Sequence, residues 1–115
     1  MHTGNAVNLR EIIATAGERS GAIWSLRGSE DLNTNLVRFA LGQGVDEHTN
    51  DEVDVIFVGV SGSGVVTIDG DEHLLSAGML VFVPKGTRRS TRSTSEDFAY
   101  LTIHRRRGPL RIEGR

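Results

Sequence analysis

The pattern of hydrophobic and polar positions changes its period about twenty residues into the chain. Before that point, four apolar residues recur at the spacing of one helical face: Leu9, Ile12, Ile13 and Ala16. Asn8 stands at the N-cap position with Glu11 three residues later, and Gly17 is a natural stop. The pattern predicts a short helix over residues 8–17. So short a helix is not stable alone, so we expect it to pack on a sheet.

From residue 20 onward the pattern is typical of β-strands. Val53, Val55 and Phe57 alternate on one strand face, and Asp69-Gly70 is a strong hairpin signal. The predicted strands are residues 22–26, 36–41, 53–60, 65–68, 73–75, 80–83, 87–90 and 98–104. Many short strands separated by glycine-rich turns indicate a sandwich or barrel, so the predicted fold class is all-β with a short N-terminal helix.

Length and composition bound the organisation of the chain. Its 115 residues form one predicted domain, with a helix over 8–17, a barrel over 20–107 and a C-terminal arm over 108–115. There is no cysteine, which excludes disulfides and thiolate metal sites. No long apolar run or signal peptide is visible, so we expect a cytoplasmic protein that does not contact a membrane.

Charge is distributed unevenly along the chain. Residues 1–84 hold four arginines and twelve acidic residues, a balance of −8, whereas residues 85–115 hold nine basic and three acidic residues, a balance of +6. A basic end attracts anions or forms a solvated surface. Aromatic residues are scarce and do not alternate with the arginines, so we expect no nucleic-acid partner.

Two spaced motifs carry a family resemblance. The first runs from Gly42 to Asn50 and is followed by the glycine-rich turn 59–64, and the second runs from Gly78 to Gly86 and continues through Arg89. Their spacing resembles the two motifs of the cupin superfamily, roughly G-x5-H-x-H-x3,4-E-x6-G and G-x5-P-x-G-x2-H-x3-N. The resemblance implies a double-stranded β-helix, also called a jelly-roll barrel, and an expectation of a homodimer.

In the family these motifs present three histidines and one glutamate to a metal. By resemblance, His48 takes the first histidine position, Asn50 the second, Val55 the glutamate position and Arg89 the last histidine position. Asparagine is a weak ligand, valine offers no donor atom, and arginine stays protonated. We therefore expect no metal and no other cofactor at this position.

Two alternatives would rebuild a metal site around His48. Asp54 or Glu52 would turn inward through a β-bulge, or a histidine would reach in from another strand, His73 or His104. His104 shares a strand face with Tyr100 and Thr102, opposite Leu101 and Ile103. The sequence leaves open which of these faces lines the barrel.

The arginine at the fourth position suggests a different chemistry. A guanidinium near His48 and Asn50 makes a donor-rich pocket for a carboxylate or phosphate oxygen. An inward Arg89 would need such a ligand or a carboxylate partner such as Asp54. The predicted ligand-binding residues are His48, Asn50, Asp54, Val55, Arg89 and His104.

The sequence thus favours a cupin-type protein that binds or senses a small anionic molecule without a metal. The alternative is a metal-dependent enzyme, an oxygenase or isomerase, with a remodelled site around His48. A third and weaker interpretation is a purely structural dimeric domain.

Overall fold

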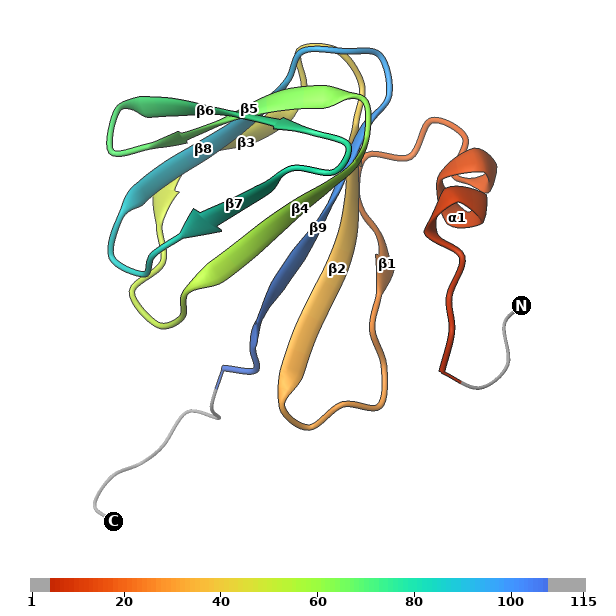
Figure 1. The fold of residues 1–115 in the computed structure, drawn as a ribbon, viewed down its shortest axis with the longest axis horizontal. Coiled ribbons are helices and arrows are strands. Elements are labelled where there is room, and N and C mark those ends of the chain that lie inside the picture. The colour runs from red at the N-terminus through yellow and green to blue at the C-terminus, as the bar shows by residue number, and fades with distance from the viewer. Residues whose placement is uncertain (1–4, 108–115) are drawn as a thin grey trace.

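The computed structural model describes residues 5–107, which form one short helix and nine strands (Figure 1). The helix is α1 (Leu9–Thr15). The strands are β1 (Gly21–Ser25), β2 (Leu32–Phe39), β3 (Gly44–Thr49), β4 (Val55–Ser61), β5 (Ser63–Ile68), β6 (Asp71–Ser76), β7 (Leu80–Val83), β8 (Arg88–Ser93) and β9 (Phe98–Arg105). The predicted all-β class with a short N-terminal helix is confirmed.

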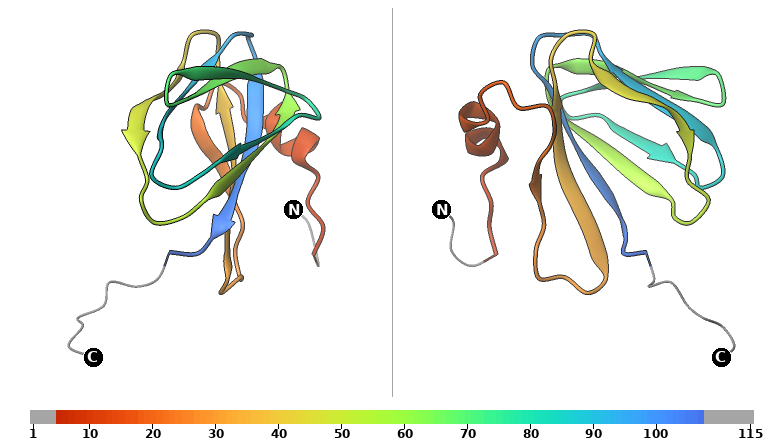
Figure 2. Two further views of the ribbon diagram at one scale, coloured as in Figure 1. Left: turned by 60° about the vertical axis from the view of Figure 1, so that its left-hand side comes forward. Right: turned by 180° about the vertical axis from the view of Figure 1, so that it is seen from behind.

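The strands form two antiparallel sheets that pack face to face. One sheet has the order β1-β2-β9-β4-β7 and the other the order β3-β8-β5-β6. The strand order crosses between sheets as a jelly roll requires, and the two further views show the sheets enclosing a barrel (Figure 2). Its main core lies between the sheets and includes Phe39, Val55, Phe57, Val66, Val83, Phe98 and Tyr100. The predicted jelly-roll barrel is confirmed.

Helix α1 forms for the reasons that the sequence indicates. The Asn8 side chain accepts a hydrogen bond from the Glu11 backbone N–H at 3.1 Å, which caps the first turn. Gly17, with φ +65°, ends the helix in the left-handed conformation. Its apolar residues pack outside the barrel, on a second core cluster that contains Ile23, Leu36 and Ala99. The helix therefore braces the outer face of the five-stranded sheet near β1 (Figure 1).

Strands β3 and β2 differ most from the prediction. Strand β3 was not expected, because all six of its residues are exposed and carry no apolar alternation. It forms because its backbone pairs with β8. Strand β2 begins at Leu32 rather than at residue 36, because its polar first half continues the ladder with β9 down to Arg105.

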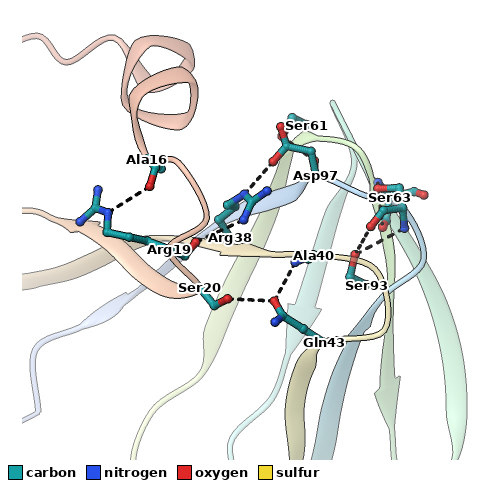
Figure 3. A network of polar contacts seen from close by, with 11 residues as sticks. Ala16, Arg19, Ser20, Arg38, Ala40, Gln43, Ser61, Ser63, Ser93 and Asp97 are labelled. Carbon is teal, nitrogen blue, oxygen red and sulfur yellow. Dashed lines mark hydrogen bonds and ion pairs between the residues drawn. The ribbon is translucent and has the colours of Figure 1, made fainter.

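A polar network ties the helix connection to one end of the barrel (Figure 3). Arg38 donates to Asp97 at 2.8 Å and to the Arg19 carbonyl at 3.4 Å. The Gln43 side chain accepts hydrogen bonds from the Ala40 backbone N–H and the Ser20 hydroxyl. These contacts join the α1–β1 connection, the β2–β3 turn and the start of β9, so this end is closed by the chain itself.

Two further predictions concern the C-terminal segment and the membrane. The predicted C-terminal arm, residues 108–115, lies outside the described residues. Within residues 5–107, no helix is long and apolar enough to cross a membrane.

Candidate functional site at the barrel mouth

The opposite end of the barrel gathers most of the residues that the sequence singled out. We call it the barrel mouth: the β3–β4 loop (50–54), the β7–β8 turn (84–87) and the end of β9 with the two residues that follow it (104–107). The Gly86 backbone N–H donates to the Asn50 carbonyl at 2.7 Å, and Arg105 donates to the Glu52 carbonyl at 3.0 Å. These bonds hold the three segments side by side.

His48 and Arg89 meet across the edge of the four-stranded sheet. They are direct partners in the β3–β8 ladder, so their side chains lie on the same face. A β-bulge between Val45 and His48 shifts the register by one residue and creates this pairing. Arg89 is buried, as are Thr91 and Ser93 further along β8, whereas Arg88 is exposed. Arg89 therefore faces inward and Arg88 outward, which the sequence left open.

The Arg89 guanidinium is held by backbone oxygens. Only 3% of the residue is exposed. Its Nε donates to the Thr87 carbonyl at 3.1 Å, and its Nη2 donates to the Pro84 carbonyl at 2.9 Å and to the Thr87 hydroxyl at 3.4 Å. Within the described part of the chain, Nη1 makes no hydrogen bond and no carboxylate forms an ion pair with Arg89.

The electrostatic environment of Arg89 is unfavourable to its charge. Burial lowers the pKa of Arg89, and the positive charge of Arg107 lowers it further, while Asp51 and Asp69 act in the opposite direction. The ion pair with Asp54 considered from the sequence does not form, because the Asp54 carboxylate accepts the Lys85 backbone N–H at 2.9 Å. Asp54 is exposed and stabilises the β7–β8 turn.

The other positions of the family's metal site have structural roles. The Asn50 side-chain oxygen accepts the backbone N–H groups of Glu52 at 2.9 Å and Val53 at 3.4 Å, which shapes the β3–β4 loop. Val55 is buried in the main core. In residues 5–107 no three His, Asp or Glu side chains come together as a metal site. The donor set at the mouth does not fit a metal.

An open cavity of about 420 Å³ lies at the mouth. It is lined by His48, Thr49, Asn50, Asp51, Glu52 and Arg107. The Nδ1 atom of His48 bonds the Asp46 carbonyl at 3.0 Å, which leaves Nε2 for other contacts. Arg107 and Glu52 form an exposed ion pair at 3.6 Å, which is weak. Sequence reasoning missed Arg107, because a basic chain end resembles a solvated surface.

The face of β9 that lines the barrel is the one with Tyr100, Thr102 and His104. Tyr100 is buried in the main core, whereas Leu101 and Ile103 point outward. His104 is half-buried and pairs with Asn33 of β2. Beside it, Asn35 donates to Asn33 at 3.3 Å and to Thr102 at 3.5 Å. Sequence reasoning assigned Asn33 and Asn35 to a loop, so it missed this polar patch on the inner face.

Deeper in the barrel, aromatic rings fill the interior. The Tyr100 ring centroid lies 5.0 Å from that of Phe98, 5.1 Å from that of Phe57 and 6.4 Å from that of Phe39. Such contacts pack the core tightly. A ligand therefore has room at the mouth rather than among these rings.

Comparisons with known proteins agree with this architecture. A family model described as a cupin domain matches residues 35–104. KdgF from a Halomonas species is 22% identical, with a TM-score of 0.67 over 80% of this chain and 81% of that one. A conserved protein of unknown function from Streptococcus pyogenes is 17% identical, with a TM-score of 0.76 over 95% and 93%.

A third solved structure, a cupin protein from Bacteroides fragilis, is 25% identical, with a TM-score of 0.61 over 70% of each chain. No curated protein matches the sequence. The structural matches support the fold. The chemistry of a ligand depends on the side chains at the mouth.

Proposed function

Because the chain belongs to the cupin family, we propose that it is a small-molecule binding protein that takes an anionic ligand at the barrel mouth without a metal. The single observation that supports this most is Arg89, a buried cation with which no carboxylate of the described residues forms an ion pair. His48 stands directly opposite on β3, and Arg107 lines the same mouth.

Burying a charged side chain is costly in free energy. A desolvated guanidinium loses its hydration, and it needs hydrogen bonds or an opposite charge in return. Backbone oxygens satisfy Nε and Nη2, while the two N–H groups of Nη1 have no acceptor in the described residues and remain accessible to solvent or to a ligand. A carboxylate or phosphate oxygen is the acceptor that best suits an arginine donor.

The size of the site favours a small ligand. The mouth cavity, about 420 Å³, lies in the range of ordinary ligand pockets. His48 and Arg107 line it together with Asp51 and Glu52, whereas Arg89 lies outside its lining, so the ligand must extend from the cavity to reach Nη1. Aromatic rings fill the barrel behind the cavity, so they leave no room there for the rest of a ligand. The charged group of the ligand is therefore the main part that the protein recognises. His48 and Arg107 lie where they can contact the same anion, and Asn33, Thr102 and His104 supply further polar contacts from the other sheet.

The enzyme alternative, an oxygenase or isomerase built on His48 with Asp54 or His104, lacks an observation in its favour. The Asp54 carboxylate is engaged by the Lys85 N–H, and no group of three ligating side chains occurs within residues 5–107. Cytoplasmic location and the absence of nucleic-acid and membrane partners remain predictions.

The proposal is tested by thermal denaturation in malonate and in inorganic phosphate. The melting temperature of the wild type should rise with anion concentration above its value in potassium chloride of equal ionic strength, because a ligand that binds only the folded state stabilises it. Arg89→Gln should lose this response. The matched control is Arg88→Gln, since Arg88 is the exposed neighbour on β8 with only a 3.7 Å contact to Glu47, and it should respond as the wild type does.

If Arg89→Gln does not fold, His48→Ala serves in its place, because His48 is exposed and its loss leaves the core intact. It should weaken the anion response. No specific response of the wild type to either anion would refute the proposal, as would equal responses of the wild type and the folded mouth variants.

A further inference from the structure

The cavity at the barrel mouth carries negative as well as positive charge. Among its lining residues, Asp51 and Glu52 are acidic and Arg107 is basic. Glu52 pairs with Arg107 at 3.6 Å, whereas Asp51 forms no ion pair with any basic side chain of residues 5–107. Two carboxylates and one guanidinium give the lining a net charge of −1 when His48 is neutral. The part of a ligand that enters this cavity therefore meets an uncompensated carboxylate.

Asp51 lies on the side of the cavity that leads to Arg89. The Gly86 backbone N–H donates to the Asn50 carbonyl at 2.7 Å, so the residue before Asp51 contacts the β7–β8 turn (Figure 1). A Cβ on Gly86 would lie 3.9 Å from the Asp51 Oδ1 atom. The next residue of that turn, Thr87, supplies the carbonyl that accepts from Arg89 Nε. The carboxylate and the guanidinium therefore lie beside the same turn.

The charges of Asp51 and Arg89 influence each other without direct contact. Burial lowers the pKa of Arg89, and the negative charge of Asp51 acts in the opposite direction. No ion pair joins the two side chains, and Arg89 Nη1 stays accessible to solvent or to a ligand. Each of the two side chains can thus bind a group of opposite charge, and one ligand that spans the mouth can supply both groups.

We infer that the ligand of the proposed anion site is a zwitterion: its anionic group binds Arg89 and its ammonium group binds Asp51 in the cavity. The ammonium site rests on the proposed function and adds a second charge to the ligand. An ammonium group donates three hydrogen bonds and accepts none, so it is complementary to a carboxylate. Aminocarboxylates, including amino acids, are the ligands of this class.

Two other kinds of ligand suit the cavity less well. A dianion such as malonate can reach Arg89 with one carboxylate, but its second charge is repelled by Asp51. A metal ion needs several ligating side chains, and no three His, Asp or Glu side chains come together in the part of the chain that the structure describes. A protonated amine needs only acceptor oxygens, and the Thr49 hydroxyl in the same lining offers one besides Asp51.

The experiment measures the melting temperature of the full chain in glycine, β-alanine and γ-aminobutyrate. Acetate, propionate and butyrate are the same carbon chains without the amino group, and potassium chloride keeps the ionic strength equal. The dependence of the melting temperature on concentration gives an apparent dissociation constant for each compound. At least one amino acid should bind roughly fivefold more tightly than its carboxylate counterpart, which is the effect of one exposed ion pair.

The substitution Asp51→Asn should abolish this preference and keep the response to the carboxylates, because it removes the charge that the ammonium group meets. The matched control is Asp71→Asn, the same substitution at an exposed residue of β6 that does not line the cavity. It should keep the preference of the wild type. Asp51 is exposed as well, so both variants should fold.

The possible outcomes distinguish the ammonium site from the anion site. Equal binding of the amino acids and their carboxylate counterparts would overturn the zwitterion and leave the anion site in place. A preference that survives Asp51→Asn would also overturn the zwitterion. A wild type that responds to neither set of compounds would refute the anion site itself. A response to n-butylamine as strong as that to γ-aminobutyrate would indicate a simple cation site and would contradict both proposals.

Discussion

At the scale of single residues, Tyr100 shows how strongly the packed interior acts on an ionisable group. Burial raises the pKa of Tyr100 to about 12, and a hydrogen bond with Thr91 acts weakly in the opposite direction. Only 2% of the residue is exposed, and three aromatic rings surround its own. The folded protein therefore stabilises the neutral phenol over the phenolate.

This gives a pH dependence with a defined sign. Because the folded-state pKa exceeds that of the unfolded chain, the contribution of Tyr100 to stability is fully present below about pH 10 and is lost between about pH 10 and pH 12. Tyr100 is the only tyrosine, so the ultraviolet absorbance of its phenolate reports it alone. We expect ionisation near pH 12 in the folded protein. In denaturant it should occur about two pH units lower.

Denaturation of Tyr100→Phe over the same pH range provides the comparison. The variant should lose that part of the pH dependence which falls between about pH 10 and pH 12, since it has no phenol to ionise. A folded wild type whose tyrosine titrates near pH 10 would contradict this account of the core.

Glycine shows which residue properties the sequence reveals and which it does not. Gly62 lies in the glycine-rich turn that the sequence indicates, and it has φ +63°, as a tight turn requires. Gly64 belongs to the same turn, but its φ is not positive, and a Cβ there would overlap the buried ring of Phe98. A turn conformation is a local property that the sequence predicts. A close approach between β5 and β9 depends on the tertiary fold.

At the scale of elements, the same distinction separates the strands. The β5–β6 hairpin was predicted from Asp69-Gly70, and both residues have positive φ, as such a tight turn requires. Strand β3 was not predicted, because its exposed residues have no pattern and its pairing with β8 spans forty residues of sequence. Alternation indicates only that Arg88 and Arg89 face opposite sides of β8, and it leaves open which of them faces inward. The carbonyls that hold it depend on the shape of the β7–β8 turn, which alternation does not describe.

Helix α1 is the element with the weakest attachment. None of its seven residues is buried, and its N-terminus depends on the Asn8 cap. We expect Asn8→Ala to remove about 0.5–2 kcal/mol of local stability. Hydrogen exchange should show faster exchange of the α1 amides, with the amides of β9 at the centre of the sheet nearly unchanged.

The control for this prediction is Asn5→Ala, a substitution of the same type at an exposed residue that precedes the cap. It should leave the exchange of α1 unchanged. If Asn8→Ala accelerated β9 as much as α1, the helix would be an integral part of the barrel rather than a brace on its outer face.

At the scale of the whole molecule, one sheet separates two surfaces of opposite character. Its inner face and the neighbouring β3–β8 edge present Arg89, His48 and His104 to the barrel mouth. Its outer face presents the apolar side chains of Leu80, Val58 and Leu101. The chain has the fold of the cupin family, and Arg89, which the sequence resemblance aligns with a metal-ligand position, donates to a backbone carbonyl.

The central claim is that this arginine makes the mouth an anion site. The most direct test is a proton–nitrogen correlation NMR spectrum in which the Nε–H of Arg89 and the ring of His48 are observed during titration. The Nε–H donates to the Thr87 carbonyl inside the protein, so we expect a resolved signal. Malonate and phosphate should shift the signals of both residues, with chloride as the control. Arg89 and His48 signals that neither anion moves, or that respond only to a tightly bound zinc or manganese ion, would contradict the account.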